Sequence, residues 1–84
     1  MAGGDHGLIV RTLDARGLIC PLPLVHARQA LAGMADGETL VVLATDPEAP
    51  IDLAALAADE GHAFAREPTG AEWRITLTKG GAAR

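Results

Sequence analysis

Hydrophobic and polar positions change their period along the chain, and these changes divide it into six segments. Residues 8–13 are rich in β-branched and aliphatic side chains, and residues 39–45 form an almost uninterrupted aliphatic run. Both compositions are typical of strands, and the second is typical of a strand buried on both faces or at the centre of a sheet. Residues 63–67 and 72–79 flank a Pro-Thr-Gly-Ala hairpin connection, and the last segment alternates between apolar and polar residues. Two further strands are therefore predicted.

Two other segments have the period of a helix. Apolar residues recur at helical spacing from Pro23 to Met34, which predicts a helix from about residue 22 or 23 to about residue 35, since proline is tolerated in a first helical turn. Residues 49–60 are alanine-rich and are followed by Gly61, a natural helix stop, so they are predicted to form a second helix. Its apolar stripe is predicted to hold Ile51, Ala54, Ala55 and Ala58, with Leu53 and Leu56 beside it.

The order of these elements predicts the fold class. Strand, helix, strand, helix, strand, strand is the pattern of an α/β (α+β) two-layer sandwich, in which both helices cover one face of a four-stranded mixed sheet. We expect residues 8–80 to form this single domain and residues 1–7 and 80–84 to be flexible ends. A chain of 84 residues has room for one small core, so any functional site should be shallow and built from few residues.

Composition narrows the classes of function. The formal net charge of −4 opposes binding through a nucleic-acid backbone, which requires a dense cationic face. No apolar run is long enough to span a bilayer, and the first seven residues lack the cationic start and apolar stretch of a signal peptide. The chain has a single cysteine, so it cannot form an intramolecular disulfide, and a cytoplasmic location is predicted.

That cysteine, Cys20, is the candidate reactive group. It lies between a turn that contains Arg16 and Gly17 and a predicted helix that begins with two prolines, Pro21 and Pro23. The unpaired N–H groups and the dipole of a helix start are predicted to lower the pKa of the thiol, so that it is ionised at neutral pH. Pro21, Pro23 and Gly17 are predicted to position the cysteine, and the two prolines also to fix its direction. A thiolate in this setting can attack a donor persulfide and later surrender the outer sulfur, without a metal or cofactor. Arg16 is a candidate to stabilise the anion or to bind the partner.

The cysteine, the carboxylates and the histidines also have alternative interpretations. A lone cysteine in a small protein is often packed and inert. The carboxylates of Asp14, Asp46 and Glu48 either gather near the cysteine and contact a basic partner, or are ordinary turn residues. The three histidines lack the close spacing of metal ligands, so no metal site is predicted.

The Cys-Pro-x-Pro element belongs to a larger set of residues. The set comprises Leu13, Asp14, Arg16, Gly17, Leu18, Cys20, Pro21, Pro23, Gly37, Glu38, Asp46, Pro47, Gly61 and His62. It resembles the TusA/SirA-like sulfur-carrier family over residues 8–80. The resemblance implies the sandwich fold and a sulfurtransferase role, in which Cys20 accepts sulfane sulfur as a persulfide. It also implies two partners, a cysteine desulfurase or rhodanese-type donor and a DsrE-like or similar acceptor protein.

Within that family the sulfur serves tRNA thiolation, molybdenum cofactor assembly or the oxidation of inorganic sulfur, and the sequence does not choose among them. Many relatives carry a charged or polar side chain beside the cysteine, whereas Ile19 and Leu22 stand there in this chain, which bears on the identity of the partner. Two other classes of function are a regulatory or interaction module, in which Cys20 is dispensable, and an RNA-binding module. The acidic charge and the lack of a stacking platform oppose the second.

Overall fold

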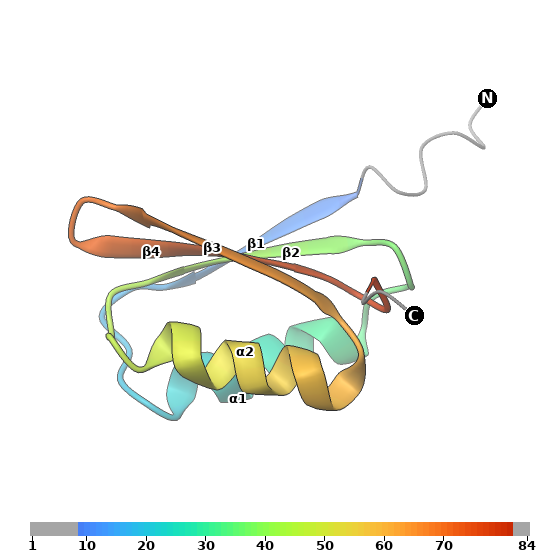
Figure 1. Ribbon diagram of the computed structural model, residues 1–84, viewed down its shortest axis with the longest axis horizontal. Helices are drawn as coiled ribbons and strands as arrows, with labels where there is room; N and C mark the ends of the chain where they lie inside the picture. Colours follow the sequence, from blue (N-terminus) through green and yellow to red (C-terminus); the bar gives the residue numbers. More distant parts are fainter. Residues whose placement is uncertain (1–8, 82–84) are drawn as a thin grey trace.

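The computed structural model describes residues 9–81 and contains one four-stranded sheet and two helices. In chain order the elements are β1 (Val10–Ala15), α1 (Leu22–Ala32), β2 (Thr39–Ala44), α2 (Ala49–Glu60), β3 (Ala63–Thr69) and β4 (Glu72–Thr78). Both helices lie on one face of the sheet (Figure 1). The predicted two-layer sandwich with a mixed sheet is thus confirmed. Of the predicted flexible ends, residues 1–7 and 82–84 lie outside the described residues.

The strands are ordered β1-β2-β4-β3 in the sheet. β1 and β2 are parallel, with Val10 opposite Thr39 and Ala15 opposite Ala44. β4 is antiparallel to both of its neighbours, β2 and β3. Because the carboxyl ends of parallel strands lie at the same edge of a sheet, the loops that follow β1 and β2 leave at the same end of the molecule. Figure 1 shows both loops entering the helix layer side by side.

The core lies between the helices and the sheet. Its largest fully buried side chains are those of Leu31, Leu40, Leu53, Ile75, Leu77, Val42, Pro23 and Pro50. β2 lies at the centre of the sheet and contributes buried side chains to this core. Val41 points to the helix-free face, yet it is also buried, at only 7% exposed. The aliphatic run at residues 39–45 therefore does encode a buried central strand.

The predicted apolar stripe of α2 was wrong. The buried positions of this helix include Leu53, Leu56 and Ala57, whereas Ile51 is 59% exposed and Ala55 and Ala58 are also exposed. Nearly every position of α2 is apolar, so helical period alone allows more than one buried face. Packing against the sheet buries the face that carries the two leucines, which removes more apolar area from water than burial of Ile51 and the alanines would.

Most boundaries agree with the predictions within two or three residues. α1 begins at Leu22 as predicted but ends at Ala32, because the N–H groups of Gly33 and Met34 donate to carbonyls three residues back, those of Ala30 and Leu31. This tighter turn still buries Met34, which explains why the apolar spacing extends past the helix. The hairpin loop is also shorter than predicted, since β3 continues through Pro68 to Thr69. Proline is acceptable there because β3 is an edge strand.

Lys79 and His62 connect elements at the end of the sheet away from the β1–α1 loop. The Lys79 ammonium donates to the carbonyls of Leu31 and Met34, both at 2.6 Å, and so caps the C-terminal end of α1. The buried His62 ring accepts the Gly80 N–H at Nδ1 (3.0 Å) and lies 3.3 Å from a Glu60 carboxylate oxygen at Nε2. Its backbone N–H donates to a carbonyl of α2, as expected of a residue that caps this helix.

Across residues 9–81, neither helix has the length and apolar character that crossing a membrane would require.

We expect Lys79→Met to lower the free energy of unfolding by about 1–3 kcal/mol, because the two half-buried carbonyls at the end of α1 lose a charged donor while the aliphatic stem is kept. Urea denaturation measures the change. Arg74→Met is the matched control, since Arg74 is an exposed cation in a long 3.9 Å ion pair with Glu67 and such pairs contribute little. Equal losses in the two variants would show that the Lys79 cap does not stabilise the fold.

Candidate functional site

Cys20 lies where the loops after β1 and β2 meet. Its backbone N–H donates to Oδ2 of Asp46, in the β2–α2 loop, at 2.6 Å. Its Sγ donates to Oδ2 of Asp52, in the first turn of α2, at 2.9 Å. Cys20 is nevertheless exposed, so it is not a packed core residue. The parallel pairing of the two strands brings together residues 26 and 32 positions apart.

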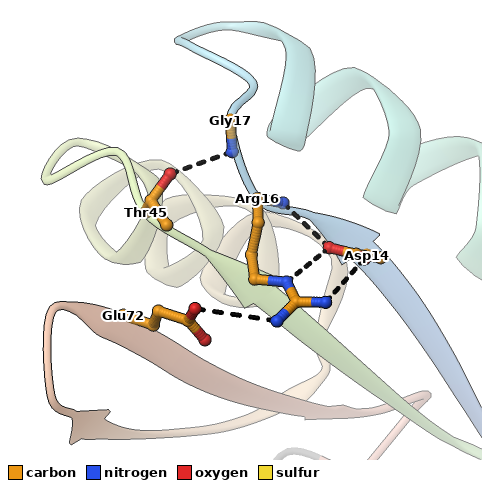
Figure 2. A network of polar contacts seen from close by, with 5 residues as sticks. All are labelled: Asp14, Arg16, Gly17, Thr45 and Glu72. Atoms are coloured by element: carbon orange, nitrogen blue, oxygen red, sulfur yellow. Dashed lines mark hydrogen bonds and ion pairs between the residues drawn. The ribbon is translucent and has the colours of Figure 1, made fainter.

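The turn before Cys20 is fixed by Gly17. The N–H of Leu18 donates to the carbonyl of Ala15 and closes a four-residue turn. Gly17 has a φ of +83° in this turn, a conformation that side chains other than glycine's rarely adopt. The Gly17 N–H also donates to Oγ1 of Thr45 at 2.9 Å, which ties the turn to the end of β2 (Figure 2). The backbone of Gly17 therefore links the loop that carries Cys20 to the end of β2.

The two prolines shape the start of α1. The Cys20–Pro21 peptide bond is cis, and the Leu22 N–H donates to the carbonyl of Ile19 across this turn at 2.9 Å. Pro21 is the N-cap of the helix, and its carbonyl accepts the first helical hydrogen bond. Pro23 is fully buried and anchors the first turn in the core. With two prolines present and the Leu22 N–H already donated, the helix start has few N–H groups left for the sulfur.

The electrostatic surroundings of Cys20 are acidic. The hydrogen bond to Asp52 raises the pKa of the thiol to about 11, together with partial desolvation and the negative charges of Asp52, Asp46 and Glu48. The prediction that the helix start lowers this pKa, so that the thiol is ionised at neutral pH, was therefore wrong. Of the three carboxylates for which two roles were considered, Asp46 and Glu48 act on the cysteine through their charge, whereas Asp14 is paired with Arg16.

Asp52 was not singled out in the sequence. Its type and place, an acidic residue in the first turn of a helix, are ordinary for a residue that complements the helix dipole. A usable signal did exist, because Asp52 lies in the first turn of the element after β2 and Cys20 lies just before the element after β1. Parallel pairing of the two strands would have placed both residues at one edge of the sheet.

Arg16 and Asp14 form a separate network. The Arg16 guanidinium donates to both Asp14 carboxylate oxygens at 2.9 Å and lies 3.6 Å from Glu72 of β4 (Figure 2). These bonds lower the pKa of Asp14 to about 2 and raise that of Arg16. Asp14 alternates with the buried Ala15, so the pair lies on the helix-free face of the sheet. The Arg16 cation is thus paired with carboxylates on this face. The sulfur of Cys20 is instead hydrogen-bonded to Asp52, which lies in the helix layer.

Exposed apolar side chains lie around the first turns of both helices. Ile19 is 69% exposed and directly precedes the cysteine, while Leu22 and Val25 of α1 and Ile51 of α2 are also exposed. Large apolar side chains exposed together on a small protein are typical of a protein–protein contact surface. The site therefore combines an accessible thiol with nearby carboxylates and exposed apolar side chains.

Comparisons with known proteins agree with this description. The family model described as "Sulfurtransferase TusA" matches residues 11–79. Two proteins of Neisseria meningitidis, from serogroup A and serogroup B strains and each described as "Putative sulfur carrier protein", are 53% identical to the chain over 51 residues, which is 61% of this chain and 69% of each relative. The crystal structure of a SirA-like protein from Desulfitobacterium hafniense has a TM-score of 0.74 and 29% identity, covering 86% of this chain and 99% of that one.

The reactivity of Cys20 should follow its raised pKa. Only the thiolate reacts with iodoacetamide, so the alkylation rate should be low near neutral pH and should rise to a midpoint near pH 11. The rate constant measured as a function of pH gives this midpoint directly. A midpoint at or below the value of about 8.5 for an ordinary cysteine would show that the carboxylates do not act on the sulfur in solution.

Asp46 should make folding sensitive to acid. Its pKa is lowered by the N–H donors of Glu48 and Cys20, so its contribution to stability is present above the unfolded value of 3.8 and is lost as the pH falls through the folded value. Asp46→Asn should therefore lower the free energy of unfolding near neutral pH, and this deficit should shrink in acid. Urea titrations at several pH values test this, with Asp59→Asn, an exposed carboxylate of α2, as the control. A deficit independent of pH would contradict the prediction.

Proposed function

Because the chain belongs to the TusA sulfurtransferase family of sulfur carriers, we propose that Cys20 accepts sulfane sulfur as a persulfide and passes it to an acceptor protein. The observation that carries this proposal is the exposure of the chain's single thiol at the junction of two ordered loops. Two hydrogen bonds hold this residue, one at its backbone N–H and one at its sulfur. A transferable group on a small carrier needs this combination of access and fixed position.

Loading requires one bond to form and one to break. The Cys20 thiolate attacks the outer sulfur of a donor persulfide, a sulfur–sulfur bond forms at Sγ, and the bond between the two donor sulfurs breaks. The donor thiolate leaves and takes up the proton that Cys20 gave up, so no external oxidant or reductant is needed. The thiolate is scarce near neutral pH, but a thiol with a high pKa is intrinsically more nucleophilic once it is ionised.

Unloading is the same exchange in the opposite direction. A thiolate of the acceptor attacks the outer sulfur of the Cys20 persulfide, and Cys20 leaves as a thiolate that is then protonated. A leaving thiol with a raised pKa departs slowly. We therefore expect the loaded carrier to transfer its sulfur slowly to small thiols in solution. Efficient release is expected within a complex with its partner.

The partners proposed for this carrier are proteins. We propose a cysteine desulfurase or a rhodanese-type protein as donor and a DsrE-like or similar protein as acceptor, acting in the cytoplasm. The exposed apolar side chains of Ile19, Leu22 and Ile51 support a contact with another protein, because large apolar side chains left in water are typical of such contacts. The ion pair of Arg16 and Asp14 is a second proposed contact, on the helix-free face. The pathway served, whether tRNA thiolation, molybdenum cofactor assembly or sulfur oxidation, follows from the acceptor.

The direct test is the intact mass of the protein after incubation with a cysteine desulfurase and cysteine. The wild-type chain should gain the mass of one sulfur atom, and treatment with a reducing agent should remove it, because a persulfide is reducible. Cys20→Ser should gain nothing, since the hydroxyl cannot form the sulfur–sulfur bond.

Partner binding distinguishes the carrier from an interaction module. If Cys20→Ser binds and regulates a partner as the wild-type chain does, and the wild type gains no sulfur, the thiol is dispensable and the carrier proposal is wrong. Arg28→Ala, on an exposed part of α1, serves as the matched surface variant and should load normally.

A further inference from the structure

Asp52 is hydrogen-bonded to the sulfur of Cys20, so its carboxylate is placed to influence sulfur transfer. We propose that Asp52 is a specificity-determining residue for Cys20: its carboxylate, hydrogen-bonded to the sulfur, slows reaction with anionic and neutral sulfur compounds and favours donors that present a cation beside their reactive sulfur. This inference rests on the proposed carrier function and concerns which partners that function admits.

The geometry fixes Asp52 against the sulfur. Its Oδ2 lies 2.9 Å from Sγ of Cys20, within the range of a direct hydrogen bond. Its backbone N–H donates to the carbonyl of Glu48 at 3.0 Å, which places it inside the first turn of α2. The next residue, Leu53, is fully buried and anchors that turn on the sheet. The carboxylate is therefore held at the thiol by an ordered helix rather than by a mobile loop.

Other charged groups near the site have different roles. Asp46 uses one carboxylate oxygen for the Cys20 N–H and the other for the Glu48 N–H, so it holds the two loops together. Glu48 acts on the sulfur through its charge alone. The Arg16 cation is paired with carboxylates on the other face. Of these groups, Asp52 is the one whose side chain is hydrogen-bonded to the sulfur of Cys20.

The consequence for reactivity follows from charge. The Asp52 hydrogen bond is the largest cause of the raised pKa of Cys20, so the free carrier holds its thiol protonated. A cation that approaches Asp52 and Glu48 offsets their negative charge, favours the thiolate and brings the donor sulfur into reach at the same time. An anion approaching the same place meets repulsion from these carboxylates. The local field thus discriminates between donors before any bond is made.

Small disulfides of different charge test this without an identified partner. Cystamine is cationic, hydroxyethyl disulfide is neutral and dithiodiglycolate is anionic. In each case the Cys20 thiolate attacks one sulfur, forms a mixed disulfide and releases the other half as a thiolate, which takes up the proton from Cys20. Exchange rates near neutral pH should rank cationic, neutral, anionic for the wild-type chain, and the ranking should weaken as salt is added.

Asp52→Asn should reduce the ratio of the cationic to the anionic rate by about three- to tenfold, while the rate with the neutral reagent rises and the alkylation midpoint moves to lower pH. Asp52→Glu keeps the charge and should keep most of the ratio. Asp59→Asn removes one charge from the same helix away from the sulfur and should change neither quantity. These readouts separate charge selectivity from a loss of structure, which thermal unfolding of each variant monitors.

An unchanged ratio and an unchanged alkylation midpoint in a folded Asp52→Asn chain would overturn the inference. Sulfur loading by the desulfurase, followed by intact mass in the same variants, keeps the two proposals separate. If the wild-type chain and Asp52→Asn both load sulfur while the ratio stays unchanged, the carrier function stands and the role of Asp52 is wrong. If the wild-type chain does not load, the carrier function itself is wrong.

Discussion

The parallel pairing of β1 and β2 is the constraint on which the surroundings of Cys20 depend. It places the carboxyl ends of two strands side by side, so the loop that carries Cys20 and the loop that carries Asp46 meet at one edge of the sheet. The antiparallel strand β4 pairs with the other side of β2, and β3 forms the edge beyond it. Without this pairing, Cys20 would still precede a helix, but Asp46 and Asp52 would not reach it.

The site combines an exposed sulfur with an ordered backbone. Gly17 and the hydrogen bond to Thr45 fix the turn before Cys20, while Pro21 and the buried Pro23 fix the chain after it. The carboxylate of Asp46 accepts a hydrogen bond from the Cys20 N–H, and that of Asp52 accepts one from the sulfur. A carrier has to present its cargo to different proteins, and its own thiol should react little between these encounters. The arrangement satisfies both requirements, since access is high and the resting thiolate population is low.

One end of the molecule holds contacts that stabilise the fold, and the other end holds the cysteine site. At the end opposite Cys20, Lys79 caps α1 and His62 joins the start of β3 to the residues after β4. These half-buried polar contacts secure the helices on the sheet, while the aliphatic core supplies most of the burial. The Cys20 end can therefore hold a carboxylate against a thiol, an arrangement that contributes to selectivity more than to stability. The Arg16 and Asp14 pair occupies a third region, the face that no helix covers.

The sequence by itself determined the elements, their order and the candidate reactive residue, because hydrophobic period, proline and glycine placement and a single cysteine are local signals. It also led to the family, through the residues around Cys20. Only the tertiary structure decided the electrostatics of the thiol and the buried face of α2. Asp52 is 32 residues from Cys20, so a pKa inferred from the neighbouring helix start omitted its strongest perturbation. Likewise, a helix apolar on nearly every side takes its orientation from the sheet it packs against.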